Sequence, residues 1–177
     1  MKTDWRRIGI RELAALISGK LREKGIDALL VGGACVSIYT KNRYQSSDLD
    51  FITHAPMKEV SAALSEAGFR RGKSRHFVRH DCPFFIEFVS PPAAIGREPL
   101  TDEKKIKTRS GTIALLTPTD CVKDRLAAFY HWSDPQALEQ ALMVTEAQDI
   151  DLGEVRRWSV KEGHEEKYQA FLRKLKG

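Results

Sequence analysis

Two aspartates, Asp48 and Asp50, are separated by one residue in the run Ser-Ser-Asp-Leu-Asp-Phe-Ile. Side chains alternate between the two faces of a strand, so on a strand both carboxylates would share one face while Leu49 and Phe51 enter the core. Like charges this close repel unless a cation lies between them or one takes up a proton. Hard oxygen ligands favour Mg²⁺ or Mn²⁺ over zinc. The spacing therefore predicts a divalent-metal site; the alternative is the solvent face of an amphipathic edge strand.

A glycine pair, Gly32 and Gly33, closes an apolar run upstream of these acids. Residues 28–39 are typical of a short buried strand that passes through a glycine turn into a helix. Glycine lets the backbone approach a ligand closely, and a helix N-terminus offers free N–H groups to a phosphate. We expect a phosphate-binding turn here; the alternative is a turn that uses glycine for its geometry alone.

A third acid, Glu87, is the only charged residue in the later apolar run from Pro83 to Val89. A charged residue inside a central strand usually has a partner or a metal. A strand carrying one acid beside a strand carrying two would complete a metal cradle, so we predict Glu87 as the third acid. The alternative is an edge strand with Glu87 facing water. Nearby Asp81 precedes a Cys-Pro pair and is predicted to be a turn residue.

The combined pattern resembles the nucleotidyltransferase superfamily with its polymerase-β-like palm. The residues that carry the resemblance are the run Val31-Gly-Gly-Ala, Arg43, Ser46 and the run from Asp48 to Phe51. More narrowly, they are similar to the small prokaryotic branch that includes the AbiEii-type toxins and minimal nucleotidyltransferases. The resemblance covers about residues 27–90 and, more loosely, the helices to about residue 145.

This resemblance implies roles for individual residues. It implies that the nucleoside triphosphate is contacted around the glycine turn by Gly32, Gly33, Arg43 and Ser46. It implies that Asp48 and Asp50 ligate magnesium and that Glu87 helps to activate the attacking hydroxyl. The chain departs from the family where a serine often follows or replaces the second glycine, because Gly33 and Ala34 offer only backbone. The interval from Gly33 to Asp48 is also long, which predicts an extended loop before the acid-bearing strand.

A strong helix start is predicted at Thr117, with Pro118 at the first helical position and Asp120 three residues after the cap. In the small prokaryotic branch a lysine on this helix often assists nucleotide binding, and Lys123 is the matching residue. The alternative for Lys123 is a solvated helix lysine. Where the branch usually has an Arg-Asp pair beyond this helix, the chain has a Ser-Asp pair.

The chain carries a net charge of +5, with a pI of about 9.2. Part of the basic excess lies between the two acid-bearing runs, at Arg70, Arg71, Lys73, Arg75 and Arg79. Such a patch can attract a triphosphate or an RNA acceptor. A solvated hairpin is the alternative.

A zinc site is a weaker prediction from the same region. His76 and His80 share one face of a strand or helix, and Cys82 follows them. Their spacing matches no closed structural zinc pattern, so we disfavour this interpretation.

Hydrophobic periodicity and turn signals predict the helices and strands that hold these residues. Helices are predicted at about 4–24, from the glycine turn to about 40, at 57–67, and after Thr117 with breaks at 133–135 and around Gly153. Strands are predicted up to Val31, around Asp48, and near 69–71, 76–80 and 84–89, with a hairpin at 105–116. This order predicts an α+β fold: a mixed-sheet nucleotidyltransferase-like palm in residues 1–116 and a C-terminal helical region in residues 117–177.

Length and composition suit one enzyme-sized unit, because 177 residues with 42% hydrophobic content can build a sizeable core. No apolar run of roughly eighteen residues and no signal-like start are present, so we expect a cytoplasmic protein without a membrane partner. Three widely spaced cysteines, Cys35, Cys82 and Cys121, favour reduced thiols.

Two classes of function fit these features. In the first, the protein is a magnesium-dependent enzyme, or manganese-dependent, that moves a nucleoside monophosphate from an NTP to an RNA, protein or small-molecule hydroxyl, in a toxin–antitoxin system or outside one. In the second, it is a non-catalytic protein of the same fold that binds nucleotide, RNA or a partner protein, such as a partner toxin or antitoxin.

Overall fold

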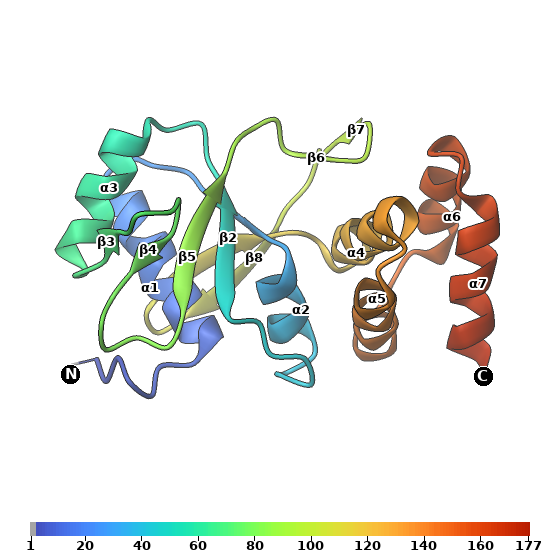
Figure 1. The fold of residues 1–177 in the computed structure, drawn as a ribbon, viewed down its shortest axis with the longest axis horizontal. Coiled ribbons are helices and arrows are strands. Elements are labelled where there is room, and N and C mark those ends of the chain that lie inside the picture. Colours follow the sequence, from blue (N-terminus) through green and yellow to red (C-terminus); the bar gives the residue numbers. More distant parts are fainter. Residues whose placement is uncertain (1–2) are drawn as a thin grey trace.

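A seven-stranded mixed sheet and the helices around it make up the first part of the molecule, and further helices follow it (Figure 1). The structure, a computed structural model, describes residues 3–177. Strands and helices alternate irregularly along the chain, and parallel and antiparallel pairs occur in one sheet. The fold is therefore α+β, as the sequence predicts.

The strands are β1 (Leu29–Val31), β2 (Asp48–Ile52), β3 (Arg70–Arg71), β4 (Phe77–Val78), β5 (Phe85–Val89), β6 (Ala94–Ile95), β7 (Glu98–Pro99), β8 (Lys104–Thr108) and β9 (Gly111–Leu115). The helices are α1 (Ile10–Glu23), α2 (Gly33–Tyr39), α3 (Met57–Glu66), α4 (Pro118–Trp132), α5 (Pro135–Ala147), α6 (Leu152–Lys161) and α7 (Glu165–Lys176). The small β6–β7 hairpin was not predicted; it forms a separate two-stranded sheet.

Strand order in the main sheet is β3-β4-β5-β2-β1-β9-β8, so the acid-bearing strands β2 and β5 are adjacent and interior. Strand β2 pairs antiparallel with β1 and parallel with β5. Strand β5 also pairs with β4. The edge-strand alternatives for the three acids are therefore wrong, because neither strand lies at an edge.

The core lies on one face of this sheet. Leu49 and Phe51 of β2 are fully buried, while the alternate residues of the strand are half-buried, as the period of two predicts. Strand β5 has the same alternation, with Ile86 fully buried. These residues share one apolar cluster with side chains of the surrounding helices. The opposite face is less completely covered, and the three acids lie there among apolar neighbours such as Phe85 and Val89.

The N-terminal helix is shorter than predicted, because it begins at Ile10 and not near Asp4. Gly9, its cap residue, has an extended backbone, and glycine disfavours helix. The preceding Trp5 packs against Phe69 with 5.8 Å between ring centroids, and the Arg79 guanidinium lies 4.3 Å from the Trp5 ring centroid. Tertiary contacts rather than a helix thus hold this segment.

The C-terminal helices confirm one predicted boundary and correct another. Thr117 caps α4, accepting a hydrogen bond from Asp120 N at 3.1 Å, and Pro118 is the first helical residue. The break predicted around Gly153 occurs a few residues earlier, at 148–151 between α5 and α6, where Asp151 caps α6 by accepting from Glu154 N. A further break separates α6 from α7, where the backbone φ of Gly163 is +80°. The domain boundary at 116/117 stays a prediction.

The hairpin predicted at 105–116 forms as β8 and β9. None of the helices within residues 3–177 is long and apolar enough to cross a membrane.

Candidate active site

Three carboxylates meet on the polar face of the sheet. Strand register sets Asp50 beside Glu87 on β5, and Asp48 lies two residues before Asp50 on the same strand face. One carboxylate oxygen from each acid lies within 4.8 Å of those of the other two. Within residues 3–177 this is the only group of three or more His, Cys, Asp or Glu side chains so arranged. The structure thus brings together the three acids that the sequence predicts.

The electrostatics of this triad suit a divalent cation. Burial and, after it, the charges of Asp48 and Glu87 together raise the pKa of Asp50 to about 6. Among the described residues, no lysine or arginine nitrogen lies within 4.0 Å of the Asp48 or Asp50 carboxylate. The protein therefore supplies negative charge and hard oxygen donors here, and the nearest basic influence on Asp50 is the charge of Arg125, which is not in contact with it. These donors fit Mg²⁺ or Mn²⁺.

Gly32 and Gly33 fold against this triad. The backbone φ of Gly32 is +69°, and a Cβ added there would lie 2.8 Å from Asp50 Oδ2. A Cβ at Gly33 would lie 3.1 Å from Ser46 Oγ. Both conformation and close approach therefore require glycine at position 32, and the turn passes directly beside the Asp50 carboxylate.

Ser46 acts on Asp48 in this structure. Its hydroxyl donates to Asp48 Oδ1 at 2.9 Å, and its backbone N–H donates to Ser37 Oγ at 2.9 Å. Ser46 is buried in the loop before β2, so these contacts fix the side chain of Asp48 at the start of that strand. A direct contact of Ser46 with nucleotide stays a prediction.

His76 joins the site at Glu87, a role that the sequence did not indicate. The distance from His76 Nε2 to Glu87 Oε2 is 3.4 Å, and His76 Nδ1 lies 3.0 Å from Ser74 Oγ. The β4–β5 pairing brings them together, since Phe77 lies opposite Ile86. The disfavoured zinc interpretation is wrong, because His76, His80 and Cys82 form no such ligand group in the described chain.

Arg43 and Lys123 both occupy ion pairs. Arg43 pairs with Glu146 of α5, with 2.9 Å between nitrogen and oxygen, and half of each side chain is exposed. Its contact with nucleotide stays a prediction.

Lys123 has only 6% of its side chain exposed, so the solvated-lysine alternative is wrong. Its Nζ lies 3.1 Å from Asp120 Oδ1, 3.1 Å from Glu154 Oε1 and 3.5 Å from Glu98 Oε1. Lys123 thus joins α4 to α6 and to the β7 strand. Its nucleotide role stays a prediction.

A cleft of about 280 Å³ extends from Asp50, the one acid of the triad that lines it, toward α4. Gly32 and Asp50 line one side, Asp124 and Arg125 another, and Ile95 of the β6–β7 hairpin a third. Arg125 Nε donates to Asp124 Oδ2 at 3.1 Å, and Arg125 Nη1 donates to Gln140 Oε1 at 3.3 Å. No role was predicted for Asp124 and Arg125, although they directly follow Lys123 on the strongly capped helix α4.

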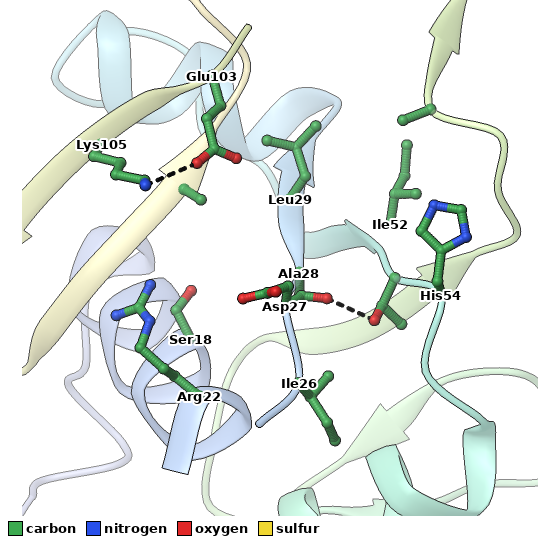
Figure 2. A pocket seen from close by; sticks show the side chains of 13 residues that line it. Ser18, Arg22, Ile26, Asp27, Ala28, Leu29, Ile52, His54, Glu103 and Lys105 are labelled. Atoms are coloured by element: carbon green, nitrogen blue, oxygen red, sulfur yellow. Dashed lines mark hydrogen bonds and ion pairs between the residues drawn. The ribbon is translucent and has the colours of Figure 1, made fainter. Parts of the chain in front are cut away.

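A separate cavity of about 390 Å³ lies between α1 and the far end of strands β1 and β2 (Figure 2). Glu103 and Lys105 form an ion pair there at 3.2 Å, and Thr53 Oγ1 donates to the Asp27 carbonyl at 2.7 Å. None of the three clustered acids lines it. We therefore place the candidate active site at the smaller cleft, on chemistry rather than on size.

Solved structures with the same fold are nucleotidyltransferase-like. One is an antigenic nucleotidyltransferase-like protein from Paracoccidioides brasiliensis, with a TM-score of 0.57 and 11% identity, covering 77% of this chain and 75% of that one. Another is the antibiotic-resistance factor ANT(2'')-Ia in solution, with a TM-score of 0.54 and 12% identity over 93% of this chain and 94% of that one.

A crystal structure of ANT(2'')-Ia in complex with adenylyl-2''-tobramycin gives a TM-score of 0.53 at 11% identity, over 93% of this chain and 97% of that one. No family model matches the sequence, and no curated protein matches it either. At these identities the likeness establishes the fold alone: the chain has the nucleotidyltransferase-like fold.

Proposed function

We propose that the protein is a magnesium-dependent nucleotidyltransferase, which moves a nucleoside monophosphate from an NTP to an acceptor hydroxyl. The observation that carries the proposal is the meeting of Asp48, Asp50 and Glu87, with ligand oxygens within 4.8 Å, beside the turn at Gly32. The shared fold supports it, since the structural neighbours are nucleotidyltransferase-like and one was crystallised with an adenylylated product.

In this proposal Asp48 and Asp50 hold the metal, with Glu87 as the third ligand or base. Divalent cations bound there would stabilise the attacking and leaving oxygens of an in-line displacement at the α-phosphate. Glu87 accepts the proton of the attacking hydroxyl, a bond forms from that oxygen to the α-phosphorus, and the bond to the bridging oxygen breaks to release pyrophosphate. Positioning and charge stabilisation dominate such a reaction.

The nucleotide occupies the cleft between the glycine turn and α4. Gly32 and Gly33 bring backbone close to the phosphates, and Ser46 keeps Asp48 in place. Arg125, largely buried on the opposite wall, is a better placed phosphate ligand than Lys123, because it lines the cleft and Lys123 does not.

The motifs in residues 27–90 further support membership of the small prokaryotic branch with the AbiEii-type toxins, and with it a cytoplasmic toxin–antitoxin role. We also propose the division into a palm, 1–116, and a helical region, 117–177. The last strand of the main sheet ends at Leu115, and α4 begins at Pro118.

Calorimetric titration with each of the four NTPs, with and without Mg²⁺, tests the proposal. We expect one or more NTPs to bind only with metal, and Asp50→Asn to abolish that binding. Asp149→Asn, a change at an exposed acid, is the matched control and should bind like the parent. If the parent binds no NTP, the transferase proposal fails, and the result favours the alternative of a non-catalytic protein that binds RNA or a partner protein.

A further inference from the structure

A further cavity, distinct from the cleft at Asp50 and also of about 280 Å³, lies beyond the ends of β2 and β5. Arg71 and Arg75 of the β3–β4 hairpin line it, together with His54 after β2 and Ser90 after β5. No aspartate or glutamate belongs to its lining. A cavity with two guanidinium groups and no acid favours an anionic ligand, and guanidinium groups match phosphate geometry well.

Strand register connects this cavity to the third acid. Because Phe77 pairs with Ile86 in an antiparallel ladder, the residues before Phe77 lie alongside those after Ile86. His76 therefore meets Glu87 at 3.4 Å, and Arg75 is one residue farther toward the cavity. Ser90 lines both this cavity and the cleft that contains Asp50. A ligand can thus extend from the cavity to the acids.

The basic residues of this hairpin are available to a ligand. Arg70, Arg71, Lys73 and Arg75 are all exposed, and within residues 3–177 no carboxylate lies within 4.0 Å of their charged nitrogens. Arg79 differs from the predicted patch: its guanidinium is bound to Asp81 and to the Ala67 carbonyl and lies over Trp5. The available patch therefore consists of β3 and the turn that follows it, without Arg79.

The position of the cavity relative to β2 separates it from the nucleotide. Gly32 follows β1, on one side of Asp50, whereas the basic hairpin adjoins β5, on the other side (Figure 1). The donor phosphates belong at the glycine turn. The β5 side carries Glu87, the acid that activates the acceptor hydroxyl, so the anion bound beside it belongs to the acceptor.

We propose that Arg71, Arg75 and His54 form a subsite for a backbone phosphate of a polynucleotide acceptor, whose terminal hydroxyl reaches Glu87. The identification of the ligand as an acceptor rests on the proposed function. A polycationic amino sugar, such as the tobramycin of the ANT(2'')-Ia complex, is disfavoured because the exposed arginines would repel it.

Fluorescence anisotropy with a labelled single-stranded RNA oligonucleotide, without Mg²⁺ or NTP, tests the subsite apart from catalysis. We expect Arg71→Gln/Arg75→Gln to weaken binding about tenfold. The log–log salt slope should fall by about 0.7, the value for the loss of the one phosphate contact that the subsite makes. The matched control is Lys104→Gln/Lys107→Gln, which removes the same charge from β8, at the opposite edge of the sheet. It should change affinity less than about twofold, because isolated exposed charges contribute little.

Equal weakening in the two double variants would show a diffuse charge effect and overturn the subsite. Absence of RNA binding by the parent, or equal binding of an oligoglutamate peptide or of tobramycin, would overturn it too. Asp50→Asn should keep RNA binding while losing NTP binding. If instead the parent binds RNA at the hairpin but binds no NTP, the subsite stands and the transferase proposal fails.

Discussion

Asp50→Asn should stabilise the metal-free protein, although it removes a residue of the active site. The pKa of Asp50 is raised from 3.8 to about 6, first by burial and then by Asp48 and Glu87. One pKa unit corresponds to about 1.4 kcal/mol, so a shift of about two units makes the ionised carboxylate cost about 3 kcal/mol at pH 7. Asparagine keeps the shape and removes the charge. We expect a gain of about 1–3 kcal/mol in the free energy of unfolding.

The sign of the pH dependence follows from the direction of the shift. The folded state binds the Asp50 proton more tightly than the unfolded state, so the destabilisation is complete above pH 6 and disappears as pH falls below about 4. The advantage of Asp50→Asn over the parent should therefore shrink between these values. Urea unfolding at several pH values in the presence of a chelator measures it, with Asp149→Asn as a control for the loss of an exposed acid.

Bound metal should reverse the order of stability, so that the parent becomes more stable than Asp50→Asn. A cation that binds the folded state raises the stability of the parent by mass action, whereas the variant has lost a ligand. Adding Mg²⁺ should thus raise the Tm of the parent and leave that of Asp50→Asn almost unchanged. Two results would refute the reasoning: a metal-free variant less stable than the parent at pH 7, or a stability difference that does not respond to pH.

Further variants test the surroundings of the site. Gly32→Ala should cost about 1–3 kcal/mol in unfolding free energy and abolish NTP binding, because its φ is +69° and the new Cβ would lie 2.8 Å from Asp50 Oδ2; calorimetry and urea unfolding measure both. Lys123→Met should cost about 1–3 kcal/mol, since it removes a buried ammonium group that pairs with the half-buried carboxylates of Asp120, Glu98 and Glu154. Lys161→Met, at an exposed partner of Glu98, should cost under about 1 kcal/mol, and equal costs would contradict the buried role of Lys123. The pKa of Glu98 is lowered to about 2 by Arg157 and Lys161, so its contribution is lost as pH falls from about 4.5 toward 2, and Glu98→Gln should flatten acid unfolding in that window; an unchanged acid limb of the stability curve would argue against this.

Much of the local structure follows from short-range patterns. The spacing of Asp48 and Asp50 places them on one strand face, and the Thr117–Pro118 pair begins α4 where predicted. Both depend on interactions within a few residues, which the sequence displays directly. The N-terminal helix was predicted to begin too early, because the apolar periodicity continues on both sides of Gly9. In the structure the helix begins after Gly9, and the preceding Trp5 packs against Phe69.

Local patterns were thus enough to predict the acids, the glycine turn and the order of most elements. Contacts between distant side chains depend instead on the tertiary fold: the parallel register sets Glu87 beside Asp50, the β4–β5 pairing brings His76 to Glu87, and helix packing buries Lys123. Tertiary packing likewise places Arg125 in the lining of the cleft and holds Arg79 over Trp5, apart from the basic patch. Such contacts depend on strand register and on competition among many buried partners, and neither has a signal within a few residues of the chain.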